Sequence, residues 1–371
     1  MNIIQIFPGK IWGGAEQFIL DLGTALGEQG HNVSYLSYNV DTIKNRTKGI
    51  IPLQTLPFKG IFDFKTITAL SDIIKEKKAD IIHIHDVKFV PMVSAAKALG
   101  KCDVKIVLHR HIARGSKTNP LFRFWFKKLH NMLFVSNLAR NLWQGANKWM
   151  PQDKCRVVIN SIPPAKTNTG QHTNHSAEMP AKEKSLREIY NIPNDTPLLI
   201  FTGRVRKSKG CAVIIDALAA IKDLPFHMLF IGSCKPKDYA ETLKAKAVAG
   251  GILDRVSFHG FANNTRELIK EGDIGVSPSI VREACPLSPM EFMQAGKPII
   301  ATNNGAQPEY IQNDKTGIII SPDNSKELSD ALRRLINDKQ LRENIGNSAQ
   351  EYFNKELDYS KFISNIIESY K

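Results

Sequence analysis

Two glutamates, Glu283 and Glu291, stand eight positions apart in the stretch of this chain whose residue types are best suited to binding or catalysis. An apolar strand over 274–277 precedes them, and Pro-Leu-Ser-Pro lies between them. If a helix begins near Leu287, Glu291 lies about one turn inside it and Glu283 lies in the loop before it. The carboxylates would then act at two ends of one extended ligand, and the helix start would favour an anion. The plainer interpretation is one solvated acid in a loop and another on a helix surface.

A second candidate site follows the apolar strand over 198–202. Arg204 and Lys209 lie between this strand and a helix that we expect to end near residue 222. Two cations just past a strand end could hold a diphosphate, because guanidinium and ammonium groups both donate to phosphate oxygens. The alternative is a pair of surface cations beside a helix.

A glycine pair opens the first helix of the chain. The segment Gly13-Gly14-Ala15-Glu16 follows a strand over 2–7 and precedes an amphipathic helix and a strand over 33–37. This order indicates a βαβ unit of a doubly wound parallel sheet. The glycines do not form G-x-G-x-x-G, so the dinucleotide-binding fingerprint is absent. They form either a tight turn or a place where the backbone approaches a ligand.

Histidines follow two further strands, over 80–86 and 104–109. His85 and Asp86 end the first of these strands, and His109 and His111 end the second. Ligands bind at the carboxyl ends of parallel strands. These histidines are therefore either ligand contacts or structural groups with satisfied hydrogen bonds.

The length of 371 residues and the apolar content of 42% indicate two globular domains. Residues 160–185 have linker composition, so we expect an N-terminal domain over 1–185, a C-terminal domain over 186–355, and a C-terminal helix over 356–371 that packs back towards the N-terminal domain. The first residues are typical of a strand and not of a signal peptide. No apolar run approaches the roughly 18 residues of a membrane span. The five cysteines are scattered, which favours a reducing compartment.

The net charge of +14 is concentrated in the first half of the chain. Residues 1–190 hold 27 Lys and Arg against 14 Asp and Glu, and residues 191–371 hold 23 against 22. A basic N-terminal half could face membrane lipid, nucleic acid or an acidic substrate, or could carry no partner. The segment over 120–129 mixes aromatic and basic residues, so it is either a helix on an anionic membrane surface or a core-packed helix with a basic outer face.

Taken in order, these motifs resemble those of the retaining glycosyltransferases of the GT-B fold, family four. Gly13 to Glu16 is similar to the family's Gly-Gly-x-Glu, Gly203-Arg204 to Lys209-Gly210 to its Gly-Arg-x-x-x-x-Lys-Gly, and Glu283 to Glu291 to its E-x7-E. Gly296-Lys-Pro and Pro308-Glu309 follow as they do in that family. The resemblance covers nearly the whole chain and is strongest over 198–340.

The resemblance implies an α/β protein of two Rossmann-like domains whose parallel sheets face a central cleft. A nucleotide-sugar donor would sit mainly on the C-terminal domain and a saccharide or lipid-linked glycan acceptor on the N-terminal one. It assigns catalytic roles to His109, Glu283, Arg204 and Lys209, and substrate contacts to Gly13, Gly14, Glu16, His85, Glu291, Cys285, Leu287 and Ser288. No metal and no cofactor are implied.

Within this assignment, Arg204 and Lys209 would bind the diphosphate and stabilise it as a leaving group. Glu291 would hold the ribose hydroxyls, and Glu283 would support positive charge at the anomeric carbon. His109 matches the family histidine that faces the sugar. The chain departs from the family at residues 284–286, where Ala-Cys-Pro replaces Gly-Phe-Gly and proline removes one N–H. The amides of Leu287 and Ser288 remain for a phosphate.

Similar transferases build lipopolysaccharide core, O-antigen or capsule. We therefore expect a cytoplasmic enzyme at the inner face of the membrane, with an anionic membrane surface as partner and no nucleic acid. One alternative is a sugar-nucleotide 2-epimerase, which would need no acceptor. The other is a basic nucleic-acid-binding protein, although the chain carries no RNP, helix-turn-helix or zinc-finger signature.

Overall fold

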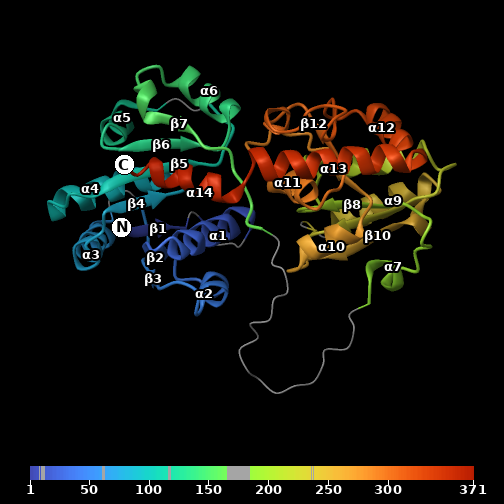
Figure 1. The fold of residues 1–371 in the computed structure, drawn as a ribbon. Helices are drawn as coiled ribbons and strands as arrows, with labels where there is room; N and C mark the ends of the chain where they lie inside the picture. The colour runs from blue at the N-terminus through green and yellow to red at the C-terminus, as the bar shows by residue number, and fades with distance from the viewer. Residues whose placement is uncertain are drawn as a thin grey trace. The chain divides into compact units, whose positions relative to one another are not determined.

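The computed structural model describes residues 1–7, 9, 13–60, 63–115, 118–164, 184–234, 236 and 238–371. The chain folds into two compact units, shown in Figure 1. Unit 1 comprises Met1–Ile162 and Tyr359–Lys371, and unit 2 comprises Pro163–Asp358. Most of the segment with linker composition lies outside the described residues.

Unit 1 is built on a seven-stranded parallel sheet in the order β3-β2-β1-β4-β5-β6-β7. Its strands are β1 (Asn2–Ile6), β2 (Asn32–Ser37), β3 (Leu53–Thr55), β4 (Ile81–Ile84), β5 (Lys105–Arg110), β6 (Asn131–Phe134) and β7 (Cys155–Val157). Its helices are α1 (Gly14–Glu28), α2 (Asp41–Thr47), α3 (Phe64–Glu76), α4 (Val90–Gly100), α5 (Pro120–Phe126), α6 (Asn137–Ala146) and α14 (Tyr359–Glu368), with 3₁₀ turns η1 (Val87–Phe89) and η2 (Gln152–Lys154).

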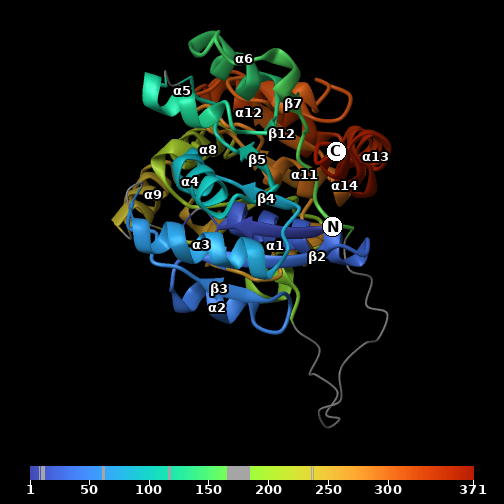
Figure 2. The ribbon, with the colours of Figure 1, turned by 90° about the vertical axis from the view of Figure 1, so that its left-hand side faces the viewer.

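Helices cover both faces of this sheet. The buried residues of α3, α4, α5 and α6 form one core with alternate residues of the strands, and α3 and α4 lie side by side in Figure 2. On the other face, Phe18 of α1 packs against His109 of β5 and Phe362 of α14. The C-terminal segment that contains α14 therefore belongs to the unit formed by the first 162 residues.

Unit 2 repeats this architecture with six parallel strands in the order β10-β9-β8-β11-β12-β13. Its strands are β8 (Leu198–Thr202), β9 (His227–Ile231), β10 (Val256–Gly260), β11 (Ile274–Ser277), β12 (Ile299–Thr302) and β13 (Ile318–Ile320). Its helices are α7 (Leu186–Ile189), α8 (Cys211–Ala219), α9 (Asp238–Ala249), α10 (Thr265–Glu271), α11 (Leu287–Gln294), α12 (Ser325–Asn337) and α13 (Lys339–Glu356), with 3₁₀ turns η3 (Lys207–Lys209), η4 (Leu253–Arg255) and η5 (Gln307–Glu309).

Most strands of both sheets are short, nearly continuous apolar runs. Those of β8 and β12, LLIFT and IIAT, are buried along their whole length. Strands buried on both faces have this composition because helices cover each side of a parallel sheet. The prediction of two Rossmann-like units with parallel sheets is confirmed.

The strand order fixes where each sheet can hold a ligand. In each unit the first strand lies beside the fourth, β1 beside β4 and β8 beside β11, and the chain winds outward from there in both directions. Loops that leave these neighbouring strands diverge to opposite faces and open a crevice at the carboxyl edge. A ligand site is therefore expected among the residues that follow β1, β4, β8 and β11. Among the described residues no helix has both the length and the apolar character needed to cross a membrane.

Candidate active site

The loop after β8 places Lys209 at the carboxyl edge of the unit 2 sheet. The last residue of this loop, Gly210, has φ +73° and caps the amino end of α8. A Cβ on Gly210 would lie 1.9 Å from the carbonyl oxygen of Pro278, which follows β11. Only glycine therefore lets the loops of these neighbouring strands touch. Arg204, in the same loop, is exposed and has no ion pair within the described part of the chain.

Glu283 meets Lys209 at this crevice. The Lys209 Nζ lies 2.7 Å from Glu283 Oε1, and the Ser279 hydroxyl donates to the same oxygen at 2.8 Å. The two charged side chains are 23% and 19% exposed. Ser279 is itself fixed, because its carbonyl accepts a hydrogen bond from the Thr302 hydroxyl. The carboxylate is thus held in one place beside a cation, although 74 residues separate the two.

The amino end of α11 lies in the same loop region. Pro286 caps the helix, and the buried Tyr310 donates its hydroxyl to the Pro286 carbonyl at 3.1 Å. Leu287 and Ser288 open the helix, so their N–H groups have no partner within it. The Ser288 hydroxyl forms a hydrogen bond with the Thr202 hydroxyl at the end of β8. The departure to Ala-Cys-Pro therefore leaves two helix amides at this edge, with Cys285 buried beside them.

Glu291 lies one turn further into α11. Its side chain is 18% exposed, and its Oε1 lies 3.6 Å from the Nε of Arg266 on α10. Arg266 was not predicted as a site residue, because it stands outside every recognised motif. Thr202 and Ser279 were missed too. Their positions after or at the end of central strands were the available signal.

In unit 1, the predicted Gly13-Gly14 pair lies at the start of α1. Gly13 is the extended residue that caps the helix, and a Cβ on Gly14 would meet no described atom within 4 Å. Glu16, in the first turn, is buried. Among the described residues, packing does not require glycine at position 14.

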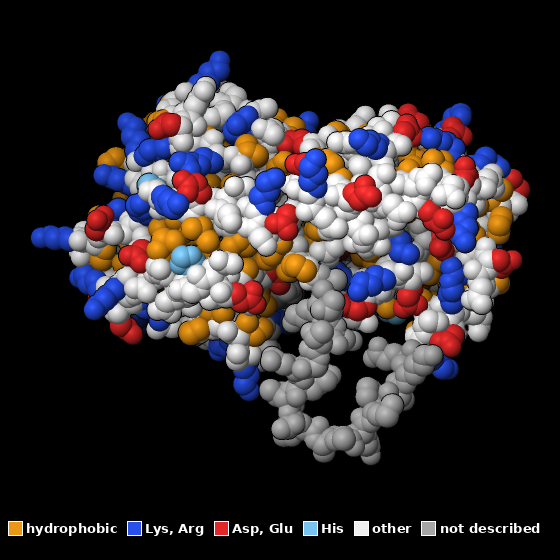
Figure 3. All heavy atoms as spheres, in the orientation of Figure 1, with side chains coloured by type: hydrophobic (Ala, Val, Ile, Leu, Met, Phe, Trp, Pro, Cys, Tyr) orange, Lys and Arg blue, Asp and Glu red, His pale blue; other side chains and the backbone are white. Residues whose placement is uncertain are grey.

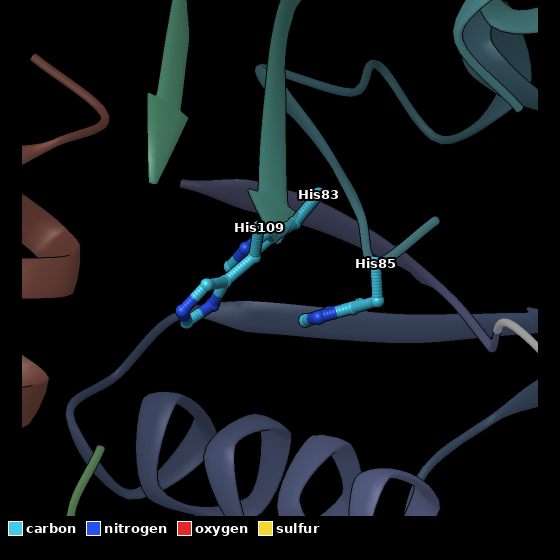
Figure 4. Close-up of side chains that lie close together, drawn as sticks. All are labelled: His83, His85 and His109. Carbon is cyan, nitrogen blue, oxygen red and sulfur yellow. The ribbon is translucent and has the colours of Figure 1, made fainter. Parts of the chain in front are cut away.

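His85 and His109 are brought together with His83 and His111 on one face of the same sheet (Figure 4 shows three of them). The His85 Nε2 donates to Gln5 Oε1 at 2.8 Å, and its Nδ1 is 3.0 Å from His111 Nε2. Burial lowers the pKa of His111 to about 4 and holds the pKa of His85 and of His109 well below the usual value. These rings are therefore neutral at neutral pH. His109 has no exposed surface, and neither of its nitrogens has a partner among the described residues.

The predicted residues thus gather in two groups, one at the carboxyl edge of each sheet. Two family models match the chain at corresponding places. The model "Glycosyltransferase Family 4" matches residues 12–166, and "Glycosyl transferases group 1" matches residues 182–352. Together they span most of both units, so the chain belongs to the family 4 glycosyltransferases of the GT-B fold. It is an enzyme that transfers glycosyl groups.

Relatives and solved structures agree with this family. An uncharacterized glycosyltransferase of Methanocaldococcus jannaschii is 24% identical, over 98% of this chain and 96% of its own length. A glycosyltransferase crystal structure from Rickettsia africae has a TM-score of 0.87 at 20% identity, covering 100% of this chain and 97% of that one. Anabaena HepE, in complex with UDP and glucose, has a TM-score of 0.80 at 18% identity, covering 100% and 99%. The lipopolysaccharide outer core galactosyltransferase WaaB has a TM-score of 0.71 at 18% identity, covering 100% and 99%.

Proposed function

We propose that this glycosyltransferase moves a sugar from a UDP- or GDP-sugar to a saccharide or lipid-linked acceptor, with retention of the anomeric configuration. We further propose that the product belongs to lipopolysaccharide, O-antigen or capsule. The observation that carries the donor assignment is the Lys209–Glu283 pair at the switch point between β8 and β11. HepE, which has the same fold, was solved with UDP and glucose, and this supports a uridine nucleotide.

The diphosphate is proposed to bind between the amino ends of α8 and α11. Helix amino ends attract anions through their unpaired N–H groups and their dipole. Lys209 has three N–H donors, and Glu283 uses one of them, so two remain for phosphate oxygens. Arg204 would add a second cation from the same loop. Glu291 would accept hydrogen bonds from the ribose hydroxyls.

In the proposed reaction, the bond from the anomeric carbon to the phosphate oxygen breaks, a bond to an acceptor hydroxyl oxygen forms, and the proton of that hydroxyl passes to the departing diphosphate. Negative charge grows on the departing diphosphate, where Lys209 and the helix amides stabilise it. Positive charge grows on the sugar, and the Glu283 carboxylate is the group proposed to face it. His109 is a further proposed sugar contact, and because its side chain has no exposed surface, this contact requires Phe18 of α1 to move aside. A neutral imidazole can make such a contact as a hydrogen-bond donor or acceptor.

The acceptor is proposed to bind to unit 1 and to be lipid-linked. Basic side chains are frequent on the face of this unit shown in Figure 3. On α5, Leu121 and Phe124 are 50% and 53% exposed, while Phe126 is buried in the core. The exposed Lys127 and Lys128 follow directly. An apolar pair beside cations suits an anionic lipid surface. The similarity to WaaB supports an acceptor of the lipopolysaccharide type.

The proposal is tested first by donor binding. Saturation-transfer NMR with UDP-, GDP- and ADP-sugars would be run on wild type and on Glu291→Ala. One sugar nucleotide that binds wild type and is lost in the variant would identify the donor. Binding of no donor would count against the assigned site.

The same samples test the alternative activity. Incubation of the identified donor with enzyme and no acceptor is followed by proton NMR. A 2-epimerase would convert the donor into a second sugar nucleotide under these conditions. A transferase leaves the donor unchanged, apart from slow hydrolysis, until an acceptor is added.

A further inference from the structure

Four histidines of unit 1 share one face of two neighbouring strands. Strands β4 and β5 pair in parallel with Ile84 opposite Leu108, so the next residues, His85 and His109, are opposite each other. Side chains two apart along a strand point to the same face. His83 and His111 therefore extend the same patch, and the ring centroids of His83 and His85 are 4.4 Å apart.

Three of the four rings are buried, and His111, at the edge of the patch, is half-buried. His83 and His109 have no exposed surface and His85 is 5% exposed. Phe18 of α1 lies over it, with its ring centroid 5.5 Å from that of His109. Tyr370, after α14, covers its other side and shares a hydrogen bond of 2.8 Å with His83 Nδ1.

Several buried nitrogens of this patch have no partner among the described residues. They are His83 Nε2, both nitrogens of His109, and the Nε2 of Gln5. A buried polar atom left without a partner is destabilising, because it loses its hydrogen bonds to water and gains none in the protein. Three of these atoms are imidazole nitrogens. A neutral imidazole offers a lone pair, which is what a metal ion binds.

We propose that His83, His85 and His109 bind one transition-metal ion of the zinc, copper or nickel type. One ring nitrogen of each lies within 4.8 Å of one ring nitrogen of both others, as Figure 4 allows the reader to follow. Ligands about 2.0–2.1 Å from a tetrahedral ion lie roughly 3.3 Å apart, so side-chain rotations must draw the rings together. A set of imidazole nitrogens selects these ions over magnesium and calcium, which prefer oxygen.

His83 and His85 each form a hydrogen bond through one ring nitrogen, which leaves the other ring nitrogen for a metal ion. Metal-ligating histidines commonly hydrogen-bond through the nitrogen that does not bind the metal. Tyr370 occupies His83 Nδ1, which leaves Nε2 for the ion. Gln5 accepts from His85 Nε2, which leaves Nδ1, now bonded to His111. His111 would be displaced from His85 and could serve as the fourth ligand, as could water.

This site is distinct from the donor site in unit 2, but it includes His109. If His109 faces the sugar as proposed above, a bound ion would withdraw it and inhibit transfer. That consequence rests on the proposed function, whereas metal binding does not. The experiment therefore measures binding directly.

The test uses the full, untagged chain, freed of metal with a chelator and dialysed. Titration with Co²⁺ should give the visible absorption of tetrahedral cobalt with one ion per chain. Zn²⁺ should displace the cobalt and should raise the thermal midpoint of wild type, because an ion that binds only the folded state stabilises it. His83→Gln and His85→Gln should weaken Co²⁺ binding at least tenfold. Tyr370→Phe should weaken it by a factor of about 10 to 100 while keeping the tetrahedral spectrum.

His227→Gln is the matched control, because His227 is also buried but lies in unit 2 against Ser257. It should bind cobalt as wild type does. The proposal would be overturned if wild type showed no tetrahedral cobalt spectrum and no thermal shift with Zn²⁺. Equal binding by wild type and by both folded histidine variants would overturn it too. The thermal shift with Zn²⁺ is measured on wild type, so it tests the proposal even if the histidine variants do not fold.

Discussion

Lys209 and Glu283 form an ion pair between two loops that leave neighbouring strands, with Nζ 2.7 Å from Oε1. Both side chains remain about a fifth exposed, so the pair contributes little to folding, of the order of 0–1 kcal/mol. Its effect is positional, because the pair and the Ser279 hydroxyl fix a carboxylate and an ammonium between two helix amino ends.

Replacement of Lys209 by methionine should lower kcat about 10²–10³-fold, the usual cost of removing one group that stabilises charge in the transition state. The free energy of unfolding should change by less than about 1 kcal/mol, because the pair is partly solvated. Steady-state kinetics and urea unfolding measure the two effects. Lys207→Met, in the same turn but with an exposed side chain, is the control and should keep most activity. A fall of equal size in both variants would show that only loop charge matters.

Glu291→Ala should weaken donor binding about 10- to 150-fold, because hydrogen bonds to a charged group contribute about 1.5–3 kcal/mol. The difference in affinity between wild type and variant should be smaller for a donor without the ribose hydroxyls, because neither protein can then form these hydrogen bonds. Calorimetry with the ribose and deoxyribose donors measures the coupling. Arg266→Gln, which removes the cation 3.6 Å from Glu291, should have a smaller effect. Equal losses with both donors would place Glu291 elsewhere on the ligand.

Gly210→Ala should destabilise unit 2 and weaken donor binding together. Its φ of +73° disfavours a side chain, and the new Cβ would lie 1.9 Å from the Pro278 carbonyl oxygen. Gly251 is the matched control, because its φ is +68° but no described atom lies within 4 Å of an added Cβ. Gly251→Ala should cost about 1 kcal/mol, or about 2–4 °C in the thermal midpoint, without a change in donor affinity. Similar losses in both variants would mean that the two loops separate easily.

Acid should destabilise unit 1 through the histidine patch. The pKa of His83 is about 3 in the folded state, against about 6.5 when unfolded. As pH falls from 6.5 towards 3 the unfolded chain binds a proton that the folded chain does not, so the free energy of unfolding falls. Well above pH 6.5 neither state binds this proton, and the effect vanishes. One such ring contributes about 2 kcal/mol between pH 7 and pH 5.

Urea unfolding of the full chain at pH 7 and pH 5 measures this dependence. His83→Gln should remove about 2 kcal/mol of the acid-dependent loss that wild type shows. His31→Gln, on the partly exposed ring of His31, should remove less. An unchanged acid dependence in His83→Gln would show that His83 accepts a proton in the folded state near its ordinary pKa.

The double variant Lys127→Glu, Lys128→Glu should lose flotation with liposomes that contain anionic lipid. Each cation near such a surface contributes about 1 kcal/mol, so reversal of two charges should weaken binding more than tenfold at low salt. Lys65→Glu, Lys75→Glu on α3 makes the same change of charge elsewhere on unit 1 and should float as wild type does. Flotation that survives in the α5 variant would remove that helix from any membrane contact.

Much of the fold was predictable because its signals are local. Each unit alternates apolar strands with helices, and this order alone predicts parallel sheets with helices on both faces. The start of α11 at Leu287 agrees with the helix start near Leu287 that was assumed from the sequence. Neither α2 nor β13 was expected, because seven residues and three residues show too little periodicity.

For the candidate site, the sequence determined the residue types and their spacing: E-x7-E, the cations after β8, the glycine pair and the histidines at two strand ends. It did not determine their neighbours. The contact of Lys209 with Glu283, the approach of Arg266 to Glu291 and the hydrogen bond of Tyr370 to His83 join residues far apart in the chain. Such contacts depend on which strands lie side by side and on where the last helix packs. Strand order and long-range packing minimise the free energy of a whole unit, so only the tertiary structure decided them.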